Sequence, residues 1–141
     1  MKTPWHLWLI GLLTLAWNSI GAFDYTATQI QWAPYMAQFT PVQLEYFHSF
    51  PTWVVACWAT AVWFGVLGSL MLLFRSRLAV LTLMISLFCI VATAVHNFIL
   101  ADVKMTEIMG PEAPIFSAAI LLVGAFLAVY ARRMAQRGVL H

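Results

Sequence analysis

The chain has 141 residues, of which 63% are hydrophobic and 9% are charged, and its formal net charge is +2. A soluble domain carries about 25% charged residues, so the composition excludes an ordinary soluble domain. The basic residues flank apolar segments and form no separate basic stripe, so no nucleic-acid partner is predicted.

Four apolar segments are long enough to cross a membrane. A transmembrane helix needs about 20 predominantly apolar residues, and such segments lie at 5–23, 52–74, 78–100 and 113–131. One such segment could be a buried helix of a soluble protein, but four in succession indicate a membrane protein. We predict an all-α integral membrane protein: an antiparallel four-helix transmembrane bundle, one domain over 1–141, with short interfacial helices on the outer (periplasmic) side.

The first span also has features of a cleaved signal peptide, because Lys2 precedes it and small residues lie near Ala22. However, Trp5, Trp8 and Trp17 are typical of a permanent span with aromatic rings at the membrane interface. We therefore expect this segment to be retained as a transmembrane helix.

The longest connection, at about 27–50, contains two helical patterns. The first has large side chains at i, i+3, i+4 and i+7, which is one face of a helix; these are Trp32, Tyr35, Met36 and Phe39. In the second, Thr40 and Gln43 fit a capping box around a proline at the first helical position. We expect both helices to lie flat in the interface, with their aromatic rings among the lipid headgroups.

Small and polar residues recur every three or four positions within the spans. In the second span they are Cys57, Ala61, Gly65 and Ser69, and in the third Thr82, Ser86, Cys89, Thr93 and His96. Small residues on one helix face allow close approach of backbones, so a compact bundle is predicted. The tail after residue 131 is expected to fray.

The charges are divided between the two sides of the spans. Six of the seven basic residues precede the first span, join the second to the third, or follow the fourth: Lys2, Arg75, Arg77, Arg132, Arg133 and Arg137. All five acidic residues lie in the other two connections: Asp24, Glu45, Asp102, Glu107 and Glu112. Because basic residues favour the cytoplasmic side, both termini are predicted to be cytoplasmic.

His96 and Asn97 are the most unusual residues inside the spans. Intramembrane ionisable groups often mark functional sites. Asn18, Cys57, His96 and Ser117 are predicted at one depth, roughly 6–9 Å below the outer helix ends. One hypothesis is an outward-facing pocket, whose ligand-binding candidates are Asn18, Trp58, His96 and Asn97. The alternative is hydrogen bonding between helices, worth about 0.6 kcal/mol per contact.

The sequence contains no recognisable catalytic pattern: no Walker loop, nucleophile elbow, zincin motif or intramembrane carboxylate pair. His48, His96, Asp24 and Glu45 are residue types that bind metals, but no two of them have the spacing of a known ligand pair. We therefore predict no enzymatic activity, no metal and no cofactor.

Several strings in the first half of the chain resemble a family. They are Trp17-Asn18, Phe23-Asp24-Tyr25, Phe39-Thr40-Pro41, Tyr46-Phe47 and Phe50-Pro51 with Trp53. In these the chain resembles small, mostly uncharacterised four-span bacterial inner-membrane proteins, some of which are nominally labelled sugar transporters. The resemblance implies the four-span topology and a bacterial inner membrane, and it implies no catalytic or binding residues.

Two functions are compatible with these features. The first is a non-enzymatic inner-membrane protein that acts by protein or lipid contacts, as an accessory or small subunit of a membrane complex. Its partners would be membrane lipids and either another protein or further copies of itself. The alternative is a protein that binds or transports a small solute or a lipid-like ligand in the outward-facing pocket.

The charge distribution predicts the orientation of the chain, which reporter fusions can test. A reporter that is active only in the periplasm should be active when fused after Glu45 and inactive when fused after Arg77. The opposite pattern would contradict the predicted topology.

Overall fold

The computed structural model describes residues 2–141, and its regular structure in this range is entirely helical. The four long helices are α1 (Trp5–Gln29), α4 (Thr52–Leu73), α5 (Leu78–Val95) and α7 (Glu112–Gln136). Helix α5 continues into a π-helical turn, η1 (His96–Leu100). Three short helices, α2 (Ala33–Met36), α3 (Pro41–His48) and α6 (Met105–Met109), occupy the connections. The predicted all-α four-helix bundle is confirmed.

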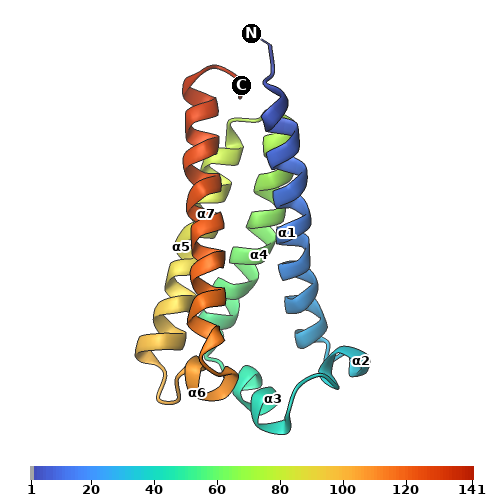
Figure 1. The fold of residues 1–141 in the computed structure, drawn as a ribbon, viewed down its shortest axis with the longest axis vertical. Coiled ribbons are helices and arrows are strands. Elements are labelled where there is room, and N and C mark those ends of the chain that lie inside the picture. Colours follow the sequence, from blue (N-terminus) through green and yellow to red (C-terminus); the bar gives the residue numbers. More distant parts are fainter. Residues whose placement is uncertain (1) are drawn as a thin grey trace.

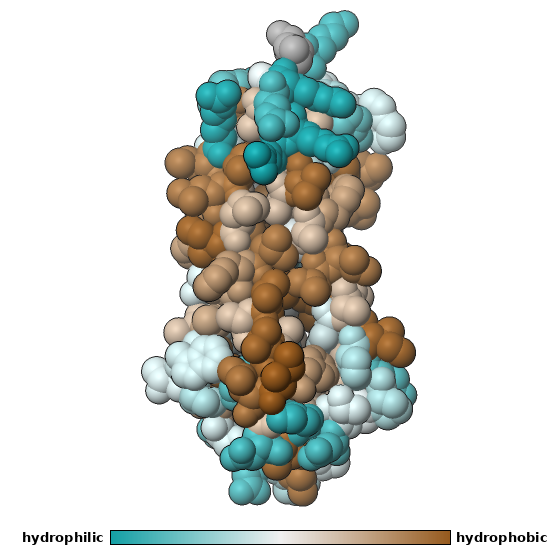
Figure 2. Space-filling model, turned by 90° about the vertical axis from the view of Figure 1, so that its left-hand side faces the viewer, coloured by the Kyte–Doolittle hydropathy of each residue, from teal (hydrophilic) through white to brown (hydrophobic). Residues whose placement is uncertain are grey.

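Each long helix, counting η1 with α5, is long and apolar enough to span a membrane. The surface in Figure 2 has a hydrophobic belt between two more polar ends. The protein is therefore a multi-pass membrane protein. Both termini lie at one end of the bundle, which we call the basic end, whereas α2, α3 and α6 lie at the other, which we call the acidic end (Figure 1).

The long helices form a bundle in which the neighbouring pairs do not pack equally closely. Helix α4 packs on α1 and α5, and α5 packs on α4 and α7. Glycine permits close approach of these helices, since a Cβ at Gly68 would lie 2.5 Å from Cδ2 of Leu83, and one at Gly11 would lie 2.5 Å from Cδ2 of Leu73.

Helices α1 and α7 pack less closely: the rings of Trp17 and Phe116 have centroids 6.5 Å apart, and the His6 imidazole shares a hydrogen bond with the Tyr130 hydroxyl. We call this junction the α1–α7 seam.

Helix α1 extends six residues beyond the predicted end of the first span, from 23 to Gln29. Its last turns are more polar, and in them the Thr28 hydroxyl donates a 2.7 Å hydrogen bond to the carbonyl oxygen of Asp24, four residues earlier. The helix ends before Gln31, which has a positive φ of 55°. The segment predicted as an interfacial connection from residue 27 therefore begins inside α1.

The expectation that the C-terminal tail frays is wrong. Gly138 has φ of 73°, and the amide of Val139 donates to the carbonyl of Met134, the arrangement of a Schellman helix end. This turn directs Leu140, which is 1% exposed, into the main hydrophobic core. The amide of His141 donates a 2.8 Å hydrogen bond to the carbonyl of Arg75. The tail therefore covers the basic end of the bundle.

This packing predicts that Leu140→Ala destabilises the protein. Truncating a fully buried leucine costs about 2–4 kcal/mol, because it removes apolar contacts and leaves a cavity. The unfolding midpoint in detergent should therefore fall clearly below that of the wild type. Gln136→Ala, at an exposed position on the same helix end, is the control and should leave the midpoint unchanged. Equal midpoints for the two variants would show that the tail is not docked.

Candidate functional site

A π-helical turn buries His96 and Asn97 together at the end of α5. The amide of Ala101 donates to the carbonyl of His96, five residues earlier, with a length of 2.8 Å. A π turn holds one more residue than an α turn, and such turns are frequent at functional sites. Here two consecutive side chains are buried, His96 at 8% and Asn97 at 7% exposure.

The two side chains bind each other. Nδ1 of His96 lies 3.1 Å from Oδ1 of Asn97. Because an amide oxygen only accepts hydrogen bonds, Nδ1 donates, which leaves Nε2 with a free lone pair in the neutral imidazole. The imidazole also meets the rings of Phe50 and Trp53 edge-on, with centroids 5.8 and 5.5 Å away. His96 is thus held in one orientation.

His96 is attached to a larger network of rings at the acidic end, which we call the aromatic cluster. Its members are Phe23, Tyr25, Trp32, Tyr35, Phe39, Tyr46, Phe47, Phe50, Trp53 and Trp58. They come from α1, α2, α3 and α4 and from the segments between these helices, and their contacts are edge-to-face. Each such contact contributes about 0.5–1.5 kcal/mol beyond burial. The cluster therefore fixes the short helices to the bundle.

One polar contact reinforces the cluster where α2 meets α1. The Tyr35 hydroxyl donates a hydrogen bond to the carboxylate of Asp24. Burial, together with this hydrogen bond, raises the pKa of Tyr35, so its hydroxyl stays protonated and keeps donating. Tyr35 thus has a partner for its hydroxyl group.

Tyr46 differs from Tyr35 in this respect. It is 9% exposed, and its buried hydroxyl has no hydrogen-bond partner among residues 2–141. Burial, and to a smaller degree the carboxylate of Glu107 on α6, raises the pKa of Tyr46. Leaving a buried hydroxyl unsatisfied costs about 1–3 kcal/mol, so this group needs a partner.

A second polar site lies in the middle of the bundle. Nδ2 of Asn18 donates to the carbonyl of Gly65 at 3.1 Å and to the hydroxyl of Ser69 at 3.0 Å. Ser69 in turn donates to the hydroxyl of Thr14 at 3.4 Å. On α5, the Ser86 hydroxyl donates to the carbonyl of Ala61 at 2.6 Å. These hydrogen bonds join α1 and α5 to α4.

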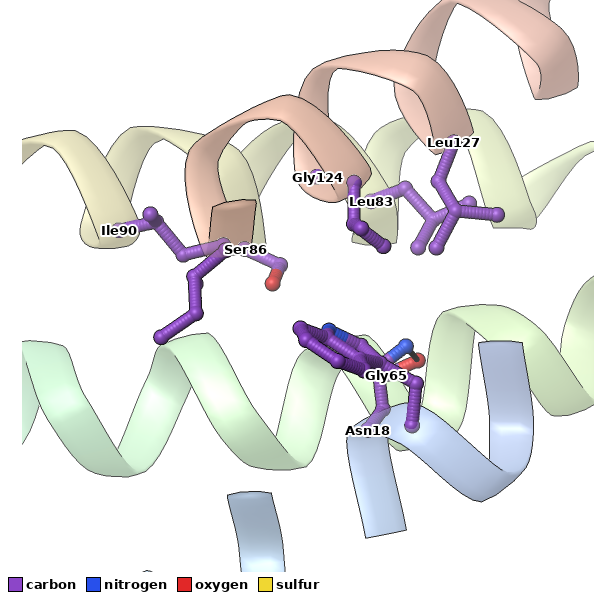
Figure 3. Close-up of a pocket in the computed structure, with 10 residues that line it drawn as sticks. Asn18, Gly65, Leu83, Ser86, Ile90, Gly124 and Leu127 are labelled. Carbon is purple, nitrogen blue, oxygen red and sulfur yellow. Dashed lines mark hydrogen bonds between the residues drawn. The ribbon is translucent and has the colours of Figure 1, made fainter. Parts of the chain in front are cut away.

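Asn18 and Ser86 also line a small cavity between the four long helices, and Figure 3 shows them on different sides of it. The volume of the cavity is about 20 Å³. On this scale about 10–15 Å³ is enough for one water molecule. The cavity therefore has room for a water molecule between polar groups, but not for a solute.

The four predicted ligand-binding residues fall into two separate places. Trp58, His96 and Asn97 lie together at the acidic end, where Phe50 contacts both Trp58 and His96. Asn18 lies eleven residues before the end of α1, about 16 Å along the helix. Because α1 is longer than the predicted span, Asn18 is deeper than Cys57 or Ser117, each five residues after the start of its helix.

Sequence reasoning missed the unpartnered hydroxyl of Tyr46 and the role of Phe50 as a central ring of the aromatic cluster. The signal was available in part, because Tyr46 and Phe50 are aromatic residues of the connection whose rings were expected at the membrane interface. The candidate metal ligands do not assemble: no group of three or more His, Cys, Asp or Glu residues within 2–141 could hold a metal ion.

The contact between Asn18 and Gly65 predicts opposite effects for two glycine substitutions. A Cβ at Gly65 would lie 2.7 Å from Oδ1 of Asn18, whose amide is already held by two hydrogen bonds. Gly65→Ala should therefore separate α1 from α4 and lower stability by about 1–3 kcal/mol. At Gly21 the nearest atom to a Cβ is Cγ1 of Val62 at 3.4 Å, so Gly21→Ala should be neutral or stabilising, since alanine favours helix. Thermal unfolding of both variants in detergent tests this, and a stable Gly65→Ala variant would contradict it.

Comparisons with protein-family models, with curated proteins and with solved structures found no match. The resemblance to four-span bacterial inner-membrane proteins therefore stays a prediction.

Proposed function

We propose that the protein is a non-enzymatic component of the bacterial inner membrane that acts through protein or lipid contacts, as an accessory or small subunit of a membrane complex. The observation that carries the proposal is the α1–α7 seam. The two helices α4 and α5 each pack closely on two long neighbours, whereas α1 and α7 meet each other more loosely, through Trp17 with Phe116 and through the His6–Tyr130 hydrogen bond.

The seam has the chemistry of a surface for another transmembrane helix. Phe116, which contacts Trp17 across the seam, is 62% exposed. On a neighbouring face of the helix, roughly 100° around its axis from Phe116, α7 exposes further large apolar side chains by more than half: Ile115, Leu122, Phe126 and Val129. Helices associate in membranes by van der Waals packing and hydrogen bonds between side chains. A helix placed along the seam would give α1 and α7 a further neighbour each.

An apolar groove at the acidic end supports contacts between the protein and lipids. Phe23, Ile30 and Trp32 are among the residues that line a surface groove of about 180 Å³ where α1 meets α2. Its walls are almost entirely apolar, and it lies beside rings of the kind that anchor proteins among lipid headgroups. A lipid chain is a suitable occupant of this groove.

The proposal includes the orientation of the chain and the membrane in which it lies. Basic residues at one end and carboxylates at the other support cytoplasmic termini and a periplasmic acidic end. The family resemblance supports a bacterial inner membrane.

The alternative, transport or binding of a small solute, has less support. The cavity in the middle of the bundle has about 20 Å³, whereas ligand pockets have about 300–1,000 Å³. The separation of Asn18 from the other three candidates also divides the proposed pocket. The absence of a recognisable catalytic pattern favours a non-enzymatic role.

Photo-crosslinking can test the proposal at the seam. Replacing Phe116 by benzoylphenylalanine keeps an aromatic ring in place and adds a reactive ketone. After irradiation of intact cells, we expect a discrete adduct with another protein or with a second copy of the chain. Phe88 on α5, which is 72% exposed, is the matched control and should give no discrete protein adduct.

Two results would contradict the proposal. One is the absence of any protein adduct at position 116 at normal expression levels. The other is the same pattern of adducts at positions 116 and 88, which would indicate random collisions in the membrane.

A further inference from the structure

Three rings of the aromatic cluster meet at one place on the acidic end, which we call the ring triad: Tyr46, Phe47 and Phe50. Their centroids lie 5.3 to 6.3 Å from one another, and their planes are inclined by 63° to 79°. The rings are thus neither stacked nor coplanar: they pack edge to face, and their steeply inclined planes meet at a corner. Aromatic walls of this kind attract organic cations, because each ring face carries partial negative charge.

The short helix α6 stands over this corner. Nε2 of Gln43 donates a 3.4 Å hydrogen bond to the carbonyl of Ile108, which ties α3 to α6. Tyr46 follows Gln43 by three residues and so lies on the same face of α3. Glu107 precedes Ile108 on α6, so its carboxylate belongs to the short helix that packs against α3. The ring triad and a carboxylate therefore belong to one place, although they come from segments far apart in the sequence.

The surrounding charges favour a cation. The connections at the acidic end contain five carboxylates and only one basic residue, Lys104. The ammonium group of Lys104 donates to the backbone carbonyls of Ile99 and Ala101 at the end of η1. Its hydrogen bonds therefore go to backbone oxygens rather than to the carboxylate of Glu107.

The buried hydroxyl of Tyr46 indicates that a polar partner belongs at this corner. It is the one buried side-chain nitrogen or oxygen in 2–141 that has no hydrogen bond. A hydroxyl oxygen can accept a hydrogen bond from an ammonium group. The other buried polar groups of the acidic end, His96 and Asn97, are bound to each other.

We propose that the ring triad, the Tyr46 hydroxyl and the Glu107 carboxylate form a binding site for an organic ammonium group. The rings supply cation–π attraction, the hydroxyl accepts a hydrogen bond and the carboxylate supplies the opposite charge. Ethanolamine phospholipids carry this group at the depth of the acidic end, and a soluble amine carries it as well. This site goes beyond the proposed helix contact at the seam and does not depend on it.

Lipid retention measured by native mass spectrometry tests the site. The protein is reconstituted into nanodiscs of phosphatidylethanolamine and phosphatidylglycerol in equal amounts, released gently, and the bound lipids are counted. The wild type should retain phosphatidylethanolamine in preference to phosphatidylglycerol. Tyr46→Phe, which keeps the ring, and Glu107→Gln, at an exposed position, should each lower this preference at least about fivefold.

Two variants serve as matched controls. Tyr35→Phe removes a hydroxyl that is already bound to Asp24, and Glu112→Gln removes another exposed carboxylate of the same end. Both should keep the preference of the wild type. Because Glu107→Gln changes an exposed side chain, it keeps the test valid if Tyr46→Phe does not fold.

A competition experiment distinguishes the two sources of the ammonium group, a phospholipid and a soluble amine. Free ethanolamine added during release should displace the phospholipid if the site accepts soluble amines, and should leave it bound if the site requires a lipid. Either result supports an ammonium site. Equal retention of the two lipids by the wild type would overturn the proposal. An unchanged preference in both variants would also overturn it, and would leave a water molecule as the partner of Tyr46.

Discussion

The amide of Asn18 holds α1 against α4 through the carbonyl of Gly65 and the hydroxyl of Ser69. A membrane offers no water to an amide at this depth, so the group must find its partners within the protein. Glycine at position 65 makes the approach possible, because any side chain there would occupy the place of Oδ1 of Asn18. The close α1–α4 pair, and with it the position of the α1–α7 seam, depends on this contact.

The number and the approximate position of the spans could be predicted because hydropathy over about 20 residues is a strong signal. The capping box at Thr40 was also predictable, and the structure has both of its hydrogen bonds. The end of α1 could not be predicted in this way. Its last turns are more polar and pack against α2, a tertiary contact that hydropathy does not report.

The candidate site, too, could be predicted from the sequence only in part. His96 and Asn97 could be singled out as polar residues in an apolar segment, and the structure buries both. We inferred that Asn18 lies at the same depth as His96 by counting residues from the predicted ends of the spans. Because α1 ends six residues later than predicted, Asn18 lies about 9 Å deeper than this count gave. The unsatisfied hydroxyl of Tyr46 depends on which faces of α3 and α6 meet, and only tertiary packing determines this.

The two ends of the bundle are closed by different means. The basic end is closed by the chain itself, since Leu140 lies in the core and the last amide binds Arg75. The acidic end is closed by rings that pack edge to face. We propose that molecules of the surrounding membrane are recognised at the second end and that a neighbouring helix is recognised along the seam. These are two independent surfaces on a small protein.

The π-helical turn has a consequence for how the chain tolerates changes in length. Because η1 accommodates one residue more than a regular turn, deleting a single residue there would restore an unbroken α-helix instead of interrupting it. Successive side chains of an α-helix point about 100° apart around the helix axis. His96 and Asn97 would therefore no longer face inward together. A relative of this protein with that shorter helix would keep the bundle and lose the bonded pair of side chains.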